Sequence, residues 1–184
     1  MQQLNIGQLR STRHAALVPY ERTKCVTFVR ADVTSTSQPP IAALAESIFL
    51  QLLKFHPPGA AESIFYEAAP SLDFAEVKRL YALTNGRYGR QITQRAELTR
   101  QLATLAEIIH TRFSLFAAAG VSSLREYNAI SPRAEKWHYV LIVGDGAIAH
   151  GHGSDESPLQ MLQTICRQGP AAGIVMVLVL SIQS

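Results

Sequence analysis

An acidic residue directly follows one of the two most apolar segments of this chain. Residues 138–145 read His-Tyr-Val-Leu-Ile-Val-Gly-Asp, which places Asp145 at the carboxyl end of a predicted buried strand. In an open α/β sheet, ligands bind beyond the carboxyl ends of the strands, and a carboxylate there suits a hard cation such as Mg²⁺. An equally good interpretation is that Asp145 is a turn or helix-capping residue, because it lies between Gly144 and Gly146.

The loop after the first predicted strand would hold phosphates if this part of the fold bound a nucleotide. A phosphate cradle needs glycines, whose N–H groups can turn inward, and a lysine for the terminal phosphates. Residues 31–38 contain neither, and the pattern G-x-x-x-x-G-K-[ST] occurs nowhere in the chain. Asp32 would repel phosphates, so the loop argues against nucleotide binding. Its hydroxyl groups could still donate to an anion, and they belong to Thr34, Ser35, Thr36 and Ser37.

Basic residues are concentrated between positions 78 and 100, where Glu97 is the one acid. They could contact a DNA backbone or an acidic partner, or they could form an ordinary solvated surface. The residues concerned are Lys78, Arg79, Arg87, Arg90, Arg95 and Arg100. His150 and His152 are near each other in a glycine-rich segment, but no third ligand has the spacing of a zinc site, and we predict no metal.

Length and composition indicate one domain, with an N-terminal extension over residues 1–23 and the domain proper over 24–184. The longest apolar run, residues 174–180, is too short to span a bilayer, and residues 1–10 contain no apolar signal segment. Cys25 and Cys166 are far apart in the sequence and have no metal-binding spacing. We therefore expect a cytoplasmic protein with reduced, mostly buried thiols and no membrane association.

Predicted strands and helices alternate along the chain, which is typical of an α/β domain with a central, mainly parallel sheet. Residues 1–20 are expected to be irregular. The spacing of apolar residues predicts strands at 24–29, 62–67, 139–143 and 174–180, and a brief one at 91–93. It predicts helices at 41–55, 74–83, 95–118 and 158–167, and a short helix or turn at 124–128.

Residues 105–128 resemble a signature of the FtsK/SpoIIIE family, in which an Arg-Tyr pair on a helix is followed by A-G-V-R-N-I-x-x-Y-N. The positions that match this signature are Arg112, Phe113, Gly120, Tyr127 and Asn128. Residues 139–145 are similar to the family's Walker B strand, 167–174 to its L-G-R-A-A-G-I-H turn, and 180–183 to the end of its L-A-T-Q strand. The resemblance covers residues 57–184 with the spacing kept, and residues 24–54 more weakly.

The resemblance implies a three-layer RecA-like P-loop fold. It also implies ring-forming, ATP-driven translocation of double-stranded DNA, or of proteins in the related type VII secretion ATPases. The departures from the family all affect chemistry. Residues 31–38 replace the Walker A loop, Gly146 replaces the Walker B glutamate, and Ile182 replaces the threonine before Gln183. Glu67 is the one acid at the end of the second strand.

These observations leave three hypotheses open. The first is a degenerate, inactive ATPase module that needs no cofactor and acts as a scaffold or regulator, with other ATPase modules or subunits as partners and double-stranded DNA as a further one. The second is an active enzyme that binds ATP and Mg²⁺ through an atypical loop, with Asp145 on the metal and Gln183 as sensor. The third is a protein-recognition module that holds a peptide in the vacant nucleotide cleft.

Overall fold

A five-stranded sheet, parallel throughout, forms the centre of the molecule, and its strand order is β3-β7-β6-β4-β5. The computed structural model describes residues 3–8, 15–19, 25–31, 41–57, 59–68, 74–84, 86–145 and 158–182. The sheet strands are β3 (Cys25–Ala31), β4 (Ala61–Glu67), β5 (Gly89–Ile92), β6 (Trp137–Asp145) and β7 (Ile174–Ile182). The last strand of the chain thus lies between the first strand of the sheet and β6.

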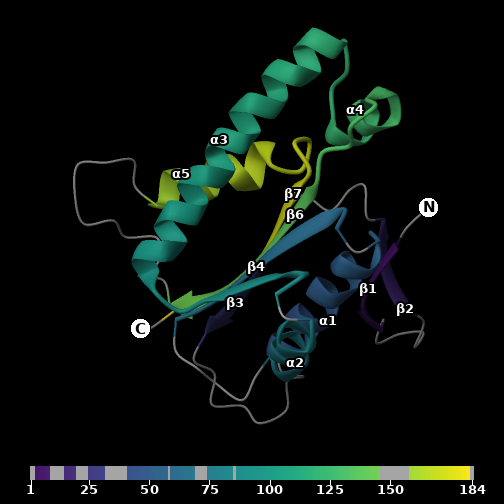
Figure 1. Cartoon of the computed structure of the whole chain (residues 1–184). Helices are drawn as coiled ribbons and strands as arrows, with labels where there is room; N and C mark the ends of the chain where they lie inside the picture. Colours follow the sequence, from purple (N-terminus) through teal and green to yellow (C-terminus); the bar gives the residue numbers. More distant parts are fainter. Residues whose placement is uncertain are drawn as a thin grey trace.

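Helices cover both faces of the sheet and give three layers (Figure 1). Helices α1 (Ile41–Lys54) and α2 (Ala75–Leu83) lie on one face, and α3 (Arg95–Ala119) and α5 (Pro158–Gln168) on the other. The short helix α4 (Leu124–Ile130) follows α3. The α/β class and the parallel sheet agree with the sequence prediction.

The central strands are apolar on both sides because each side faces a helical layer. Tyr139 and Leu141 of β6 pack into the core shared with α1 and α2, whereas Val140 and Ile142 pack into the core shared with α3 and α5. All four side chains are essentially inaccessible to solvent. An uninterrupted apolar run is the sequence pattern expected of such a doubly covered strand.

Helix α3 has the length and apolar composition of a membrane-spanning helix, but it packs as a core helix. Leu98, Leu102, Leu105 and Ile109 form its buried stripe against the sheet and α5. Its spacing of four, three and four residues is that of one helix face, which explains why the stripe is continuous. A helix with one such face is typical of a globular core.

The first twenty residues differ from the prediction of an irregular segment. They contain strands β1 (Gln3–Gln8) and β2 (Ala15–Pro19), which pair antiparallel in a separate two-stranded sheet. This sheet lies beside α1 (Figure 1). The alternation of polar and apolar residues around Leu4 and Ile6 is the period-two pattern of a strand. The pattern is hard to recognise because the residues around these two are mostly polar.

Strand register defines the two ends of the sheet. At its carboxyl end, where the strands finish, Ala31 is opposite Ile182, Asp145 is opposite Ser181, and Glu67 is opposite Val143. At its amino end, where the strands begin, the opposite pairs are Cys25 and Met176, His138 and Ile174, and Ala61 and Trp137. Ligands of open α/β sheets bind at the carboxyl end.

Candidate functional site: the two ends of the sheet

The carboxyl end of the sheet brings together the strand ends predicted to form a site. The ends of β3, β7 and β6 are neighbours, because β7 pairs with both of the other strands. The backbone of Asp145 therefore lies at the edge where a ligand would bind. The predicted phosphate-loop residues Asp32, Thr34, Ser35, Thr36 and Ser37, together with Gln183, lie outside the described residues, as does the side chain of Asp145.

Glu67 ends strand β4 at this carboxyl end, and its side chain is held by Lys78 of α2. The Lys78 Nζ lies 3.0 Å from Oε1 and 2.8 Å from Oε2 of Glu67, so it contacts both carboxylate oxygens. Glu67 is 1% exposed, whereas the Lys78 side chain is 27% exposed. A buried carboxylate of this kind is tolerated because a cation compensates its charge. The pair ties β4 to α2.

Arg112 of α3, one of the residues of the FtsK-like signature, lies at the opposite end of the sheet. Its guanidinium donates to the carbonyl oxygens of Ala172 and Lys136, each at 2.6 Å. Lys136 directly precedes β6 and Ala172 lies two residues before β7, so one side chain joins α3 to the start of both central strands. Burial lowers the pKa of Arg112, and the carboxylate of Glu135, 3.6 Å away, partly offsets this effect.

Asn128 closes the connection between α4 and β6 through its side-chain amide. Its Nδ2 donates to the carbonyl oxygen of Glu135 at 2.8 Å, and its Oδ1 accepts from the N–H of Glu135 at 2.9 Å. These two bonds satisfy both backbone groups of a residue outside regular structure. The asparagine of the signature thus fixes the approach of the chain to β6.

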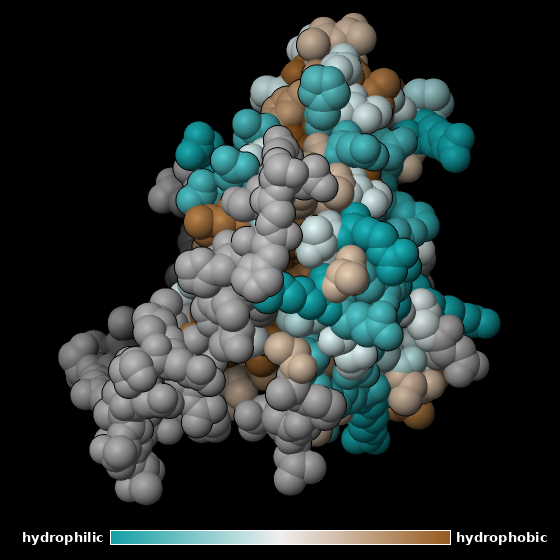
Figure 2. Space-filling model, turned by 90° about the vertical axis from the view of Figure 1, so that its left-hand side faces the viewer, coloured by the Kyte–Doolittle hydropathy of each residue, from teal (hydrophilic) through white to brown (hydrophobic). Residues whose placement is uncertain are grey.

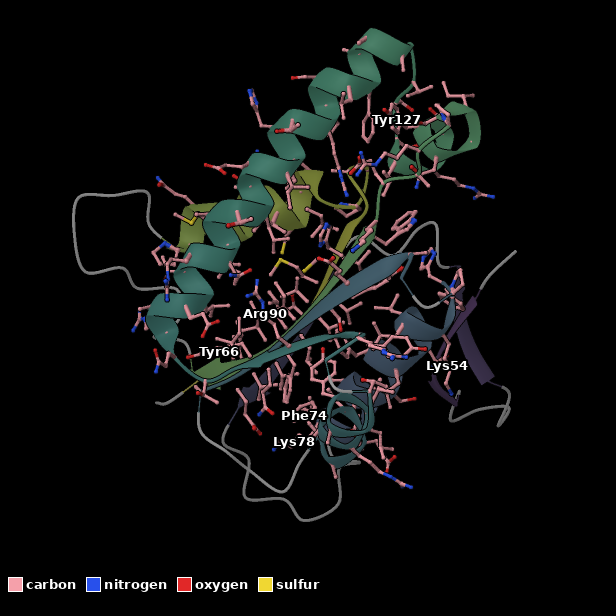
Figure 3. All side chains as sticks on the ribbon, in the orientation of Figure 1. Lys54, Tyr66, Phe74, Lys78, Arg90 and Tyr127 are labelled. Atoms are coloured by element: carbon pink, nitrogen blue, oxygen red, sulfur yellow. The ribbon has the colours of Figure 1, made fainter. Side chains whose placement is uncertain are left out.

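The remaining signature residues complete the turn after α3. Gly120 ends α3 with a φ of 69°, a left-handed conformation that glycine adopts without steric cost. The ring of Tyr127 packs against the ring of Phe116, with 5.7 Å between ring centroids, and the rings of Phe113 and Phe116 form a T-shaped pair with 5.9 Å between centroids. Figure 3 shows Tyr127 beside the carboxyl-terminal part of α3.

The turn before β7 packs directly on α4. The N–H of Leu124 donates to the carbonyl oxygen of Ala171 at 2.8 Å. Gly173 has a φ of 79°, and a Cβ added there would lie 2.0 Å from Cδ2 of Leu124. We call Arg112, Leu124, Asn128 and Gly173 the amino-end clamp. Two of the stretches that resemble the family, residues 105–128 and 167–174, therefore meet here, at the end of the sheet opposite to the one where ligands of such sheets bind.

The six basic residues predicted as a DNA or partner contact do not share one face. Lys78 and Arg90 lie on opposite sides of the sheet (Figure 3). Arg90 donates to Gln101 Oε1 at 2.6 Å, and Arg79 of α2 is exposed, 3.9 Å from Glu76. The other three are exposed at the β5 and α3 side of the molecule, and they are Arg87, Arg95 and Arg100.

A cavity of about 330 Å³ opens between α3 and the beginnings of β4, β5 and β6. Its charged lining includes Arg87, Arg90, Lys136 and Glu62, of which Lys136 and Glu62 form an ion pair. His138 also lines it, and burial, together with the charge of Arg112, lowers the pKa of its imidazole to about 4. The sequence gives no sign of this cavity, because its residues come from separate segments that are brought together only by the register of the sheet.

The surface near the carboxyl end is mostly polar where the structure describes it. Figure 2 looks at the side of the molecule where β7 ends, and hydrophilic residues gather over the right-hand half of that view. Hydrophobic residues form small separate areas in the same view. Over the described residues of the whole chain, the large exposed hydrophobic side chains come from several different elements, and they are Leu83, Phe113, Leu115, Ile130 and Leu159.

Comparisons with solved structures find the same fold in proteins that include the following three. The conjugation coupling protein TcpA of pCW3, solved as a monomer with ATPγS, aligns with a TM-score of 0.69 and 18% identity over 97% of this chain and 48% of that one. The cytoplasmic domain of EssC aligns with a TM-score of 0.73 and 13% identity over 98% of this chain and 33% of that one. Thermomonospora curvata EccC (ATPases 2 and 3), solved with a signal sequence peptide, aligns with a TM-score of 0.63 and 11% identity over 97% and 29%.

This chain spans less than half the length of each of those proteins. No family model matches the sequence, and no curated protein matches it either. The likeness is therefore one of structure, and it extends over nearly the whole chain. This chain has the RecA-like P-loop fold of the FtsK/SpoIIIE-type ATPase domains, as its sequence motifs predicted.

Proposed function

We propose that this chain is a non-catalytic FtsK-like module that serves as a scaffold or regulator within a larger translocation or secretion ATPase. Two properties of the chain support this function. Its fold is that of an ATPase domain, and the residues that hydrolysis requires are replaced at the end of the sheet where a nucleotide would bind. The proposed partners are the other ATPase modules or subunits of the same cytoplasmic assembly.

The observation that carries the proposal is the pairing of Glu67 with Lys78. Glu67 is the described acid at the end of the second long strand, and it would have to face a ligand to take part in hydrolysis. Instead it is 1% exposed, and both of its oxygens contact Lys78 Nζ. A carboxylate used in this way stabilises the packing of α2 on the sheet, so it is not available to orient a water molecule.

The sequence of the carboxyl end supports the same conclusion. The loop at residues 31–38 has no glycine and no lysine, and Gly146 follows Asp145 where a catalytic glutamate would be needed. Without a cradle for the phosphates and a group to position the attacking water, ATP hydrolysis has neither its binding site nor the residue that orients its nucleophile. These residues do not fit ATP and Mg²⁺, and we derive no catalytic step for them.

Similar structures indicate the kind of assembly. EssC and EccC have been solved with more than one ATPase domain in one chain, and TcpA is a conjugation coupling protein. A module of this fold can contribute packing surface without contributing chemistry. The exposed basic residues around β5, Arg87 and Arg90 among them, are the proposed contact for an acidic face of a neighbouring module.

A phosphate-release assay tests the proposal. The purified chain with Mg²⁺ and ATP should release phosphate at the rate of a blank without protein, and Asp145→Ala should give the same rate. If the wild-type chain is active and Asp145→Ala is not, Asp145 holds a catalytic metal and the chain is an enzyme with an atypical phosphate loop.

A DNA-binding assay separates a translocase context from a secretion context. Because Lys78 is paired and Arg79 lies on the other side of the sheet from Arg90, we expect only weak, salt-dependent binding of a double-stranded oligonucleotide. Fluorescence anisotropy at low and physiological salt measures it. Submicromolar binding at physiological salt that is lost in the double variant Arg87→Glu/Arg90→Glu would make DNA the partner of the β5 surface instead.

A further inference from the structure

The two cysteines of the chain lie side by side in the folded molecule. Cys25 begins β3 and Cys166 lies near the end of α5, yet their Sγ atoms are 2.9 Å apart. This separation is about 1 Å longer than the ~2.05 Å bond of a disulfide. Both side chains are partly accessible to solvent, and the chain contains no other cysteine.

Cys25 and Cys166 belong to β3 and α5, two elements that make few other contacts with each other. In the described sheet, β3 is an edge strand that pairs only with β7, beginning at Cys25 opposite Met176. Cys25 and Cys166 both pack against the hydrophobic core on the α3 and α5 side. A covalent bond between them would attach this edge strand to a helix as well as to its neighbouring strand.

We propose that Cys25 and Cys166 form a reversible disulfide by exchange with a small disulfide such as oxidised glutathione. The Cys25 thiolate attacks one sulfur of the small disulfide, forms a mixed disulfide and releases the first small thiolate. Cys166 then loses its proton and attacks Sγ of Cys25, which releases the second small thiolate. The protons lost by the two protein thiols end on the two released thiolates. Overall, two protein thiols are oxidised and one small disulfide is reduced.

The electrostatics of the pair assign the order of these steps. The hydrogen bond from Cys166 lowers the pKa of the Cys25 thiol to about 7, although burial opposes this shift. The same hydrogen bond, together with burial, raises the pKa of Cys166. A thiol whose pKa is close to the ambient pH is the best attacking group, so Cys25 reacts first and Cys166 resolves the mixed disulfide.

The bond would act on the strand that leads to the phosphate-loop position. Residues 32–38 follow β3 directly. A bond at Cys25 would attach the start of β3 to α5, so the oxidised chain would hold this edge strand through α5 as well as through β7. This inference does not depend on the proposed function, because an active and an inactive module contain the same pair of thiols.

Mass spectrometry of the full chain in a glutathione redox buffer tests the proposal. The wild-type chain should lose both free thiols and two hydrogen masses without gaining a glutathione adduct, and a reductant should restore it. Cys166→Ser should stop at a stable adduct on Cys25, and Cys25→Ser should form an adduct at least about tenfold more slowly at pH 7. A wild-type chain that accumulates stable adducts, or bonds only between chains, would overturn the proposal.

Thermal unfolding gives a second measurement that does not rely on single variants. The oxidised wild-type chain should unfold at least about 5 °C above the reduced chain, since the bridge closes a long loop. The double variant Cys25→Ala/Cys166→Ala should show the same Tm in both buffers. Equal melting temperatures for the oxidised and reduced wild-type chain would mean that the two sulfurs are not bridged.

Discussion

The amino and carboxyl ends of this sheet differ in how their residues are used. At the amino end, the residues that resemble the FtsK/SpoIIIE signature are bonded in place, and Arg112 and Asn128 satisfy backbone groups at the starts of the central strands. At the carboxyl end, the sequence lacks the phosphate-binding residues, and Glu67 is used for packing.

This difference separates the parts of a family signature that specify a fold from the parts that specify a reaction. A buried arginine that holds two carbonyl oxygens is costly to lose whether or not ATP is bound. Residues that only touch a ligand are under no such structural constraint. We therefore expect changes at the amino end to cost more stability than changes at the carboxyl end.

The largest expected effect is that of Arg112→Ala. This change leaves the carbonyl groups of Lys136 and Ala172 without their buried donor and should lower the free energy of unfolding by about 3–5 kcal/mol. Urea denaturation followed by circular dichroism measures it. Arg100→Ala, an exposed position on the same helix, is the control and should change stability by less than about 0.5 kcal/mol. Equal effects of the two changes would mean that Arg112 does not stabilise the amino-end clamp.

Substitutions at two glycines distinguish the stability cost of a steric contact from the cost of an unfavourable backbone conformation. Gly173→Ala should cost about 2–4 kcal/mol, since the new Cβ meets Leu124 and φ is positive. Gly120→Ala has a similar φ but nothing within 4 Å, and it should cost about 1 kcal/mol. The same denaturation experiment compares them, and an equal cost would show that the contact with Leu124 adds nothing.

Stability of the amino end should depend on pH through His138. Its folded pKa is about 4, below its ordinary value of 6.5, so the neutral imidazole stabilises the fold fully above pH 6.5 and progressively less as the pH falls to 4. The loss should be roughly 2–3 kcal/mol. Unfolding measured between pH 4 and 7 should be less pH-dependent in His138→Gln, and an unchanged dependence would mean that this imidazole titrates normally.

A smaller effect is expected at the carboxyl end from Glu67→Gln. The change leaves Lys78 beside a neutral group and should cost about 1–3 kcal/mol. In the double variant Glu67→Gln/Lys78→Met, much of that loss should be recovered, which a double-mutant cycle measures as coupling. Glu76→Gln is the matched control, because its pairing with Arg79 is exposed and should be worth under about 0.5 kcal/mol. Absence of coupling would mean that Glu67 does not depend on Lys78.

The sequence predicted the sheet well because its strands are covered on both faces. The apolar runs that contain Val140 and Val177 could only be strands buried in the core. The helical spacing of apolar residues from Leu98 to Ile109 predicted α3 and its buried face. The pairing of β1 with β2 was missed because the alternating pattern of β1 is short and partly polar, and because β2 is a five-residue segment that ends in a proline. Local composition is a poor guide where a strand is not buried in the main core.

The candidate site was less predictable because its properties arise from distant residues. Asp145 was placed correctly at the end of a strand, since that depends only on the run before it. Glu67 was recognised as the acid of its strand, but nothing local indicates that Lys78 binds it from α2. The cavity beside His138 and the contact of Cys25 with Cys166 likewise depend on strand order and register, which no single segment encodes.

Isothermal titration calorimetry of the reduced, full chain with ATP and Mg²⁺ tests the central claim most directly. We expect no binding heat at ligand concentrations up to the millimolar range, because the sequence of the carboxyl end lacks a phosphate cradle, and we expect the same result for Asp145→Ala. A micromolar Kd in the wild-type chain that Asp145→Ala abolishes would contradict the account, and the two ends of the sheet would then both have kept their ancestral roles.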